Sequence, residues 1–287
     1  MSTLKIGIVG QGSLALSYLA RLPSLLDRLL LVKGTNERTS SRLRNALRAG
    51  QWVNDYASFA RVKMIWIAVA DSALPGILAD LAQHVKLTGK MIVLCDTLQG
   101  SAAFPVLNDA GARVATLYLM PNAAERIFIV EGHAGVIDEL RQMLADDRRK
   151  VIELAPGAKP LFISGLHLCA HMLIPFAGAA VESFRLAGLS RTEATLALQA
   201  IGSNALRAYI RGGDKALPRA EAECMQNALD ESREAIRAVS PRLAELYDQH
   251  PGEWMFYVGS KQFWSGSAQK DKARKDAARA AAAGACQ

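Results

Sequence analysis

Cysteine and aromatic residues are scarce in this chain, and both shortages limit what it can be. Four cysteines occur in 287 residues, far apart and without a C-x-x-C pair, so no disulfide framework is expected. We interpret them as reduced cytoplasmic thiols. Aromatic residues make up 6% of the chain, and no basic stripe interleaved with aromatics occurs, which argues against a nucleic-acid partner.

A signal peptide and a membrane-spanning run are also missing from the pattern. Residues 1–5 lead straight into an apolar run, which leaves no room for a secretory signal. The apolar run at residues 64–70 has the length of a buried strand rather than of a membrane span. We therefore expect a cytoplasmic protein with no membrane partner. Its 51% hydrophobic and 21% charged residues are typical of a globular chain, long enough for two domains.

Acidic residues are outnumbered by basic ones, and the formal net charge is +7. Residues 266–287 carry five basic and two acidic residues, which leaves +4 on the rest of the chain. That balance is mild for a chain of this size. It suits a phosphate-bearing cofactor and a small anionic substrate.

A glycine-rich turn near the N-terminus organises the first half. The apolar residues 4–9 predict a strand, and Gly10-x-Gly12-x-x-Ala15 follows directly, ahead of a helix-compatible run. Glycines there permit a tight turn and a close approach of the backbone to a pyrophosphate, which the unpaired amides of the next helix can hold. The predicted cofactor-binding residues of this turn are Gly10, Gln11, Gly12, Ser13 and Leu14. The alternative is an ordinary strand-to-helix turn of another α/β protein.

The end of the second predicted strand, residues 29–32, favours NADP over NAD. NAD-binding domains place an acid about 20 residues after the glycines to bind the ribose hydroxyls. Here Glu37 is the only acid, and Arg38 is followed by hydroxyl residues that suit a 2′-phosphate. The predicted cofactor contacts are Asn36, Arg38, Thr39 and Ser40. The alternative is a polar loop in which Ser40 or Ser41 only caps the next helix.

Apolar runs and amphipathic helices then alternate through residue 154, which predicts an α/β fold with a doubly wound, mainly parallel sheet of Rossmann type. Further strands are expected at residues 62–70, 90–95, 114–119, 126–130 and 151–154. Ligands bind outside the carboxyl ends of such strands, so residues there are predicted to line the site. They are Ala70, Asp71, Ser72, Asp96 and Thr97 toward the cofactor, and Met120, Pro121 and Asn122 toward the substrate. The alternatives are that Asp71 only caps a helix and that Asp96 only forms a turn.

The second half is predicted to be helical. We expect a Rossmann domain at 1–155, a substrate and dimerisation domain at 156–265, and a disordered tail at 266–287. The helices are expected at residues 161–187, 190–211, 220–239 and 240–250. The first should bend at Pro175, and a capping box of Ser190 and Glu193 opens the second. One domain can hardly cover the long first helix alone, so the small residues 177–180 on it predict a homodimer.

Both halves together carry a family resemblance. It rests on residues 7–12, 36–39, 67–71, 120–122 and 129–132. The chain resembles the short NADP-dependent reductases related to pyrroline-5-carboxylate reductase and 6-phosphogluconate dehydrogenase. Within them it is most similar to a Rossmann-like branch with a helical C-terminal domain of unknown function. The resemblance covers about residues 4–250 and implies an NADPH-dependent oxidoreductase that reduces a C=N or C=O bond of a small anionic metabolite.

Three residues are candidates for the proton donor or for orienting the substrate: Lys159, His167 and His171. Lys159 fits the lysine that opens the helical domain in the resembling branch, and the histidines replace its other cleft residues only loosely. The histidines are four residues apart and share one helix face. Lys159 and His171 lie about 18 Å apart along a helix, so they cannot both touch one small substrate. We expect a histidine to donate the proton and Lys159 to anchor an anion.

Non-catalytic interpretations of these residues are also possible. A histidine on an apolar helix is often a satisfied core residue, and two histidines without a clustered carboxylate or cysteine are not expected to bind a metal. A later motif of the resembling branch survives only in part, at residues 216–219. The alternative function is therefore a non-enzymatic NADP(H)-binding dimeric scaffold or sensor.

Overall fold

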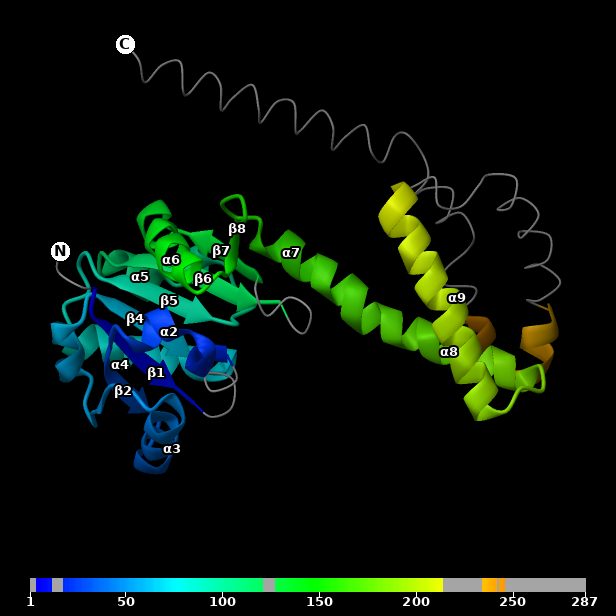
Figure 1. Ribbon diagram of the computed structural model, residues 1–287, viewed down its shortest axis with the longest axis horizontal. Coiled ribbons are helices and arrows are strands. Elements are labelled where there is room, and N and C mark those ends of the chain that lie inside the picture. The colour runs from blue at the N-terminus through cyan, green and yellow to red at the C-terminus, as the bar shows by residue number, and fades with distance from the viewer. Residues whose placement is uncertain (1–3, 12–17, 121–126, 214–233, 242, 246–287) are drawn as a thin grey trace, which may run out of the picture. The chain divides into compact units, whose positions relative to one another are not determined.

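The apolar runs of the first half form one eight-stranded sheet (Figure 1). The computed structural model describes residues 4–11, 18–120, 127–213, 234–241 and 243–245. The chain divides into two compact units, Met1–Leu168 and Cys169–Gln287, and each is described by itself. The strands, all in the first unit, are β1 Ile6–Gly10, β2 Leu29–Gly34, β3 Gln51–Trp52, β4 Met64–Ala68, β5 Met91–Cys95, β6 Arg113–Leu119, β7 Ile127–Gly132 and β8 Lys150–Glu153.

The strand order β3-β2-β1-β4-β5-β6-β7-β8 is that of a doubly wound Rossmann-like sheet, as predicted. The strands from β3 to β6 are parallel, β7 runs antiparallel to β6, and β8 runs parallel to β7. The chain passes from β1 to β2 on one side and later enters β4 on the other side of β1. The carboxyl ends of β1 and β4 therefore form the switch point at which folds of this type bind ligands.

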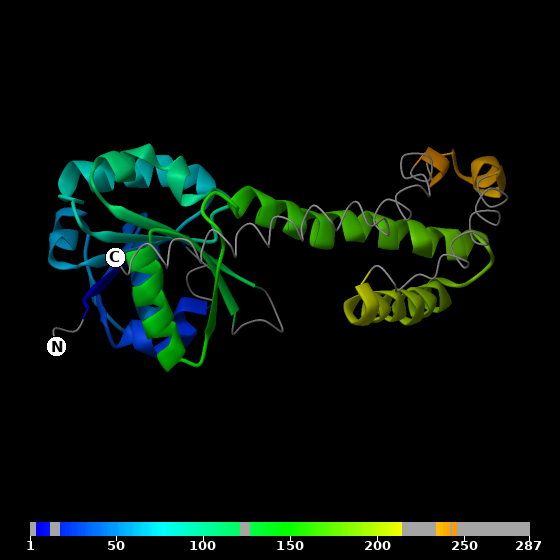
Figure 2. The same ribbon diagram turned by 90° about the horizontal axis from the view of Figure 1, so that it is seen from above.

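Both faces of the sheet are covered, which explains why its strands are apolar throughout. On β4, Met64 and Trp66 enter one hydrophobic core and Ile65 and Ile67 enter the other, all at most 1% exposed. Figure 2 shows α4 and α5 on one side of the sheet and α2 and α6 on the other. The helices of this unit are α2 Pro23–Leu26, α3 Glu37–Leu47, α4 Leu74–His84, α5 Pro105–Asp109 and α6 Ala134–Asp146.

Two local details differ from the sequence pattern. The sequence predicts that the helix after the glycine turn runs to about Leu22 and ends at Pro23. Pro23 instead begins α2, because proline has a helical φ and the first turn needs no N–H from it. In the described part of the segment before it, Leu19–Arg21 forms a 3₁₀ turn. The edge strand β3 is not predicted, because two residues are too few to show an apolar pattern.

The predicted long helix changes its winding part-way. α7 Lys159–Leu166 is followed by a π-helical segment, His167–Met172, and then by α8 Leu173–Leu186. Pro175 has no N–H for the carbonyl four residues earlier, and its ring crowds that carbonyl. The wider π turn upstream accommodates both effects. The irregularity therefore begins before the proline at which the sequence places it.

The second unit contains the predicted capping box at the start of α9 Arg191–Gly212. The Glu193 carboxylate accepts from the Ser190 N–H at 2.8 Å, and the Ser190 hydroxyl accepts from the Glu193 N–H at 3.3 Å. α8 and α9 pack against each other. Residues 234–239 and 243–245 are helical, within the last two predicted helices. The rest of those helices and the tail at 266–287 lie outside the described residues.

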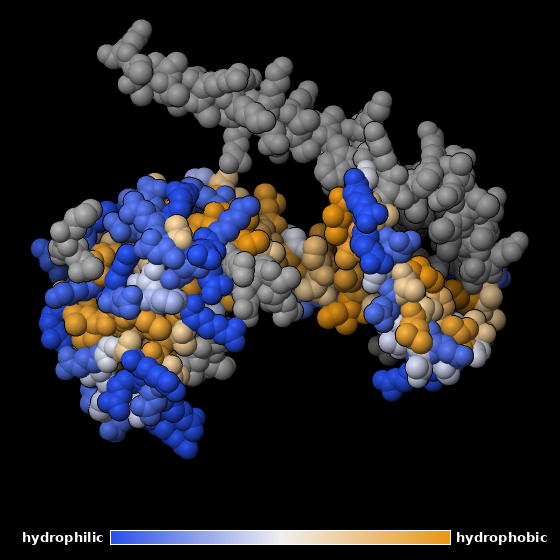
Figure 3. Space-filling model, in the orientation of Figure 1, coloured by the Kyte–Doolittle hydropathy of each residue, from blue (hydrophilic) through white to orange (hydrophobic). Residues whose placement is uncertain are grey.

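The helices carry many large apolar side chains at their surface (Figure 3). The segment Lys159–Leu186 is long and apolar enough to cross a membrane by length and composition, and none of its most apolar window is buried. The expectation that no run reaches this length is therefore wrong. An apolar helix that packs against protein has the same composition, so this finding alone does not establish a membrane partner.

Candidate active site

The ends of β1 and β4 are joined at the switch point of the sheet. The Gln11 N–H donates to the Ala68 carbonyl at 3.1 Å, so the chain leaves β1 from a fixed position after Gly10. Gly10 and Gln11 thus lie where the predicted cofactor turn begins. The other predicted residues of this turn, Gly12, Ser13 and Leu14, lie outside the described residues.

The end of β2 leads to an arginine on the first turn of α3. Asn36 caps this helix, since its Oδ1 accepts from the Thr39 N–H at 2.8 Å and from the Thr39 hydroxyl at 2.9 Å. The alternative of a serine cap is therefore wrong. The Ser40 hydroxyl instead accepts from the Gly34 N–H at 2.8 Å and donates to the Asn36 carbonyl at 2.9 Å. Arg38 is exposed at this helix end, where the helix dipole favours an anion.

Two predicted aspartates hold the loops at the strand ends together. Asp71 Oδ2 accepts from the Leu98 N–H at 3.1 Å, which joins the loop after β4 to the loop after β5. Asp96 Oδ1 accepts from the Leu119 N–H at 3.3 Å, which joins the ends of β5 and β6. Asp96 also shapes its turn, with a φ of 57° that aspartate tolerates better than most residues. Burial raises the pKa of Asp96.

The other predicted strand-end residues differ in exposure. Ala70 and Ser72 are exposed, and Met120 at the end of β6 is half-buried. Thr97 is fully buried and accepts from a backbone N–H of its own loop, so it supports the loop rather than facing open surface. Pro121 and Asn122 lie outside the described residues.

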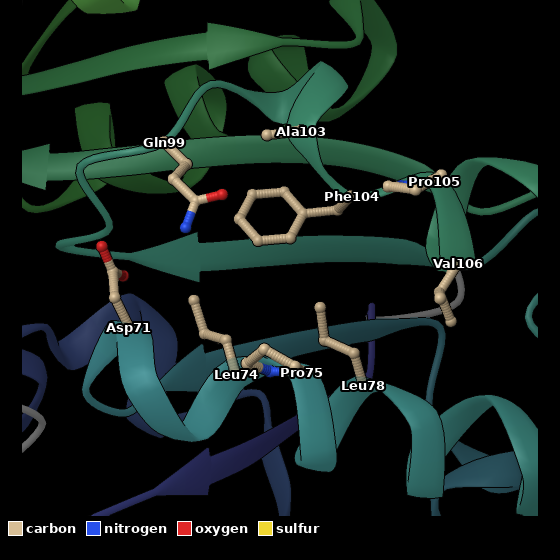
Figure 4. A pocket seen from close by; sticks show the side chains of 9 residues that line it. All are labelled: Asp71, Leu74, Pro75, Leu78, Gln99, Ala103, Phe104, Pro105 and Val106. Carbon is tan, nitrogen blue, oxygen red and sulfur yellow. The ribbon is translucent and has the colours of Figure 1, made fainter.

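A cavity of about 180 Å³ opens beside Asp71 (Figure 4). Its lining residues are Asp71, Leu74, Pro75, Leu78, Gln99, Ala103, Phe104, Pro105 and Val106. The Asp71 carboxylate and the Gln99 amide lie toward one end, and the rest of the lining is apolar. The cavity therefore suits the apolar part of a small molecule better than it suits a phosphate.

A buried lysine distinguishes the region between β5, β6 and β7. Lys159, at the start of α7, is 1% exposed, and its Nζ donates to the Thr116 hydroxyl at 3.2 Å. Glu131 on β7 is 3% exposed and lies 3.5 Å from the same hydroxyl. Burial lowers the pKa of Lys159, and nearby carboxylates act against that shift. These carboxylates belong to Glu131, Asp96 and Asp71.

Thr116, Glu131 and Ser101 are partners of this lysine region that the sequence pattern does not single out as site residues. Ser101 donates to Glu131 through its N–H at 2.8 Å and through its hydroxyl at 3.0 Å. The signal in the sequence is the acid of Glu131 directly after an apolar run that forms a buried strand. A carboxylate in such a place needs hydrogen-bonding partners, and these lie on other elements.

The two candidate histidines lie on the π-helical segment and are exposed. His167 belongs to the first compact unit and His171 to the second. Of the three candidates, Lys159 is the one that the structure places near the carboxylates of Glu131, Asp96 and Asp71. Among the described residues, no group of three or more His, Cys, Asp or Glu side chains is placed to hold a metal ion.

No protein-family model matches the sequence, and no curated protein matches it. Solved structures match at low identity. A reductive aminase from Aspergillus terreus in complex with NADPH and ethyl-5-oxohexanoate is 19% identical, with a TM-score of 0.61 over 85% of this chain and 90% of that one. An imine reductase from Myxococcus stipitatus, a V8 variant in complex with NAD+, is 14% identical, with a TM-score of 0.60 over 85% of this chain and 90% of that one. A protein from Thermotoga maritima is 13% identical, with a TM-score of 0.63 over 88% of this chain and 98% of that one. These likenesses establish the fold.

Proposed function

We propose that the protein is a cytoplasmic NADPH-dependent oxidoreductase that reduces a C=N or C=O bond in a small metabolite. The observation that carries the proposal is the buried Lys159 ammonium, which faces Glu131 of β7 and the two aspartates, Asp71 and Asp96, that follow β4 and β5 at the ligand-binding edge of a doubly wound sheet. The reductive aminase and the imine reductase of similar fold support this reaction class. A closer relation to pyrroline-5-carboxylate reductase and 6-phosphogluconate dehydrogenase, which the sequence motifs suggest, is part of the proposal.

The cofactor fits the switch point and the start of α3. Gly10 and Gln11 would face the pyrophosphate, because they begin the turn at the end of β1. Asn36, Arg38 and Thr39 would face the 2′-phosphate, since they form the exposed first turn of α3. Ser40 supports this turn from inside, with its hydroxyl already in two hydrogen bonds. When bound, NADPH would supply the hydride.

Lys159 is the residue to which we assign the proton. The nitrogen of a neutral imine gains one proton when its carbon gains a hydride, and the ammonium supplies that proton and becomes an amine, which water reprotonates. The lowered pKa of Lys159 brings the group nearer to the pH range in which such a transfer is efficient. The exposed His167 and His171 are the alternative donors.

The charge around Lys159 favours a C=N substrate over an anionic one. One ammonium faces the carboxyl groups of Glu131, Asp96 and Asp71. Such a surplus of acid attracts a group that becomes cationic on protonation, as an imine does, and it opposes a carboxylate. The apolar cavity beside Asp71 offers a place for the rest of the molecule.

The test is the oxidation of NADPH by the purified protein with a panel of cyclic imines, ketones mixed with amines, and 2-oxo acids. We expect turnover with imines or ketone–amine mixtures and slower turnover with 2-oxo acids. NADPH binding without oxidation by any member would support the dimeric scaffold or sensor instead. Failure to bind NADPH would overturn both functions.

Arg38→Ala is expected to remove the preference for NADPH over NADH. A charge-assisted contact with the 2′-phosphate contributes about 1.5–3 kcal/mol, so NADPH should bind wild-type protein at least about tenfold more tightly than NADH. Dissociation constants for both cofactors, measured by fluorescence or calorimetry, check this. Arg44→Ala is the matched control, because Arg44 is exposed on another face of the same helix. Equal affinities in wild type, or an unchanged preference in Arg38→Ala, would contradict the assignment.

We expect the protein to be a homodimer in solution. α9 exposes Leu206 and Ile210, which share one helix face, to 56% and 73%, and a second copy would remove such surface from water. Sedimentation should give a dimer at micromolar concentration, and Ile210→Glu should shift it toward monomer. Asn204→Asp adds the same charge at an exposed polar position on another face of α9 and should leave the dimer intact. A wild-type monomer, or protein found only in the membrane fraction, would contradict the proposal.

A further inference from the structure

The Glu131 carboxylate is held in one orientation by donors on both of its oxygens. Ser101 donates its N–H to Oε2 at 2.8 Å and its hydroxyl to Oε1 at 3.0 Å. Gly100, directly before Ser101, lies beside this arrangement, since a Cβ built there would be in van der Waals contact, at 3.6 Å, with both Glu131 Oε2 and the Lys159 Cβ. The carboxylate therefore presents a fixed negative charge inside the protein, 3% exposed as a residue.

The Thr116 hydroxyl connects this carboxylate to the lysine. Thr116 and Glu131 are partners across the antiparallel pair β6–β7. The hydroxyl accepts from Lys159 Nζ at 3.2 Å, and its own proton has two acceptors on Glu131, the Oε2 atom and the backbone carbonyl oxygen, each at 3.5 Å. A hydroxyl can accept one hydrogen bond while it donates another. The Thr116 hydroxyl thus bridges the Lys159 ammonium and Glu131.

We propose that Glu131 is a positioning residue, which acts through the Thr116 hydroxyl to fix the orientation of the Lys159 ammonium and to keep it charged. Buried charges that lack partners are costly, and the Glu131–Thr116 chain supplies the partner for this one. The inference rests on the proposed function insofar as Lys159 is the proton donor. Its geometric part concerns Lys159 itself and can be tested without a substrate.

Other titratable groups also face Lys159 and have to be separated from Glu131. They are Asp71 at the start of the 3₁₀ helix η3 Asp71–Ala73, Asp96 after β5, and the Cys95 thiol on β5. The carboxylates of Asp71 and Asp96 are engaged with backbone N–H groups of Leu98 and Leu119. Burial raises the pKa of the Cys95 thiol, which stays neutral at pH 7. Glu131 is the carboxylate linked to Lys159 through a described hydrogen-bonded side chain.

The first experiment measures the titration of Lys159 by NMR in protein labelled at the lysine side chains, with the signal assigned by Lys159→Arg. In Glu131→Gln we expect the pKa of Lys159 to fall by about one unit, since an opposite charge favours the charged form of a group near it. Thr116→Val, which keeps the shape but removes the hydroxyl, should lower it in the same direction. Thr116→Ser keeps the hydroxyl and should leave the wild-type value. An unchanged titration in both Glu131→Gln and Thr116→Val would overturn the proposal.

The second experiment uses the pH profile of NADPH oxidation. In Glu131→Gln the alkaline limb of the profile should move to lower pH by the same shift as the lysine titration, and Glu131→Asp should restore part of it. A uniform loss of rate with an unmoved profile would mean a structural role and would contradict the proposal. Glutamine at position 131 keeps an oxygen that can accept from Ser101. If Glu131→Gln nevertheless fails to fold, the comparison of Thr116→Val with Thr116→Ser tests the proposal. If no compound is reduced by wild type, the proposed function fails, and the lysine titration still decides this inference.

Discussion

Lys159→Met is expected to slow the proposed reduction by about a hundredfold or more. General acid groups contribute about 10²–10⁴ in rate, and methionine keeps the length of the side chain without its proton. The effect should fall on kcat, because the loss concerns the proton transfer of the reaction step rather than the contacts with the 2′-phosphate of NADPH at the start of α3. Single-turnover oxidation of bound NADPH, with the best imine of the panel, measures it directly.

A loss of folding could imitate this result, because the variant leaves Glu131 buried without its cation. Breaking a buried charge pair in this way costs about 3–5 kcal/mol. The double variant Lys159→Met with Glu131→Gln removes both charges and should recover most of the stability without recovering the rate. Recovery of the rate together with the stability would show that Lys159 acts only in folding.

The histidines provide the competing outcome for the same assay. His167→Gln and His171→Gln are expected to change kcat less than about threefold, because both side chains are exposed on the π-helical segment. A hundredfold loss of kcat in either variant, with a normal rate in Lys159→Met, would show that this histidine is the proton donor, as the sequence predicts. Lys159 would then keep only the anchoring role that the sequence assigns to it.

The sheet can be predicted from the sequence because its strands are covered on both faces. A continuous apolar run such as that of β4 is required when alternate side chains enter two different cores. The same logic misses β3, whose Gln51 is exposed and whose Trp52 is only half-buried. An edge strand of two residues is fixed by its neighbour β2 and leaves no period in its own sequence.

The sequence predicts only those site residues that directly follow a predicted strand. Asp71 and Asp96 follow predicted strands, and the structure places both at the ligand-binding edge, although each is engaged with the backbone of a neighbouring loop. The pairing of Thr116 with Glu131 depends on the register of β6 and β7, which no local pattern carries. Lys159 then reaches this pair from 43 residues beyond Thr116. Contacts of this kind come from topology rather than from spacing.

The long apolar helix shows a different limit. Its length and composition are the same whether lipid or protein covers it, because both remove apolar side chains from water. The sequence pattern therefore shows that the helix has an apolar surface to be buried, and it does not distinguish burial in lipid from burial against protein. The small residues at 177–180 predict a dimer, and the exposed apolar side chains of α9 favour one as well.

Gly132→Ala is expected to destabilise the first unit by about 3 kcal/mol, the sum of a strained backbone and a collision. Gly132 ends β7 with a φ of 140°, which side chains rarely allow. An added Cβ would lie 2.4 Å from the Val114 carbonyl oxygen and 2.6 Å from the Ala115 Cα. Both belong to the backbone of β6, which is paired with strands on each side and cannot retreat.

The same collision would reach the proposed site, because Gly132 directly follows Glu131. Pushing β7 away from β6 would lengthen the contact between Glu131 and the Thr116 hydroxyl, so the titration of Lys159 should change together with the stability. Urea unfolding followed by circular dichroism measures the first effect and NMR the second. Gly157→Ala is the control: it has a φ of 74° but nothing within 4 Å of an added Cβ, so it should cost only about 1–2 kcal/mol from strain. If the two variants lose the same stability, the close approach of β6 is not what requires glycine at position 132.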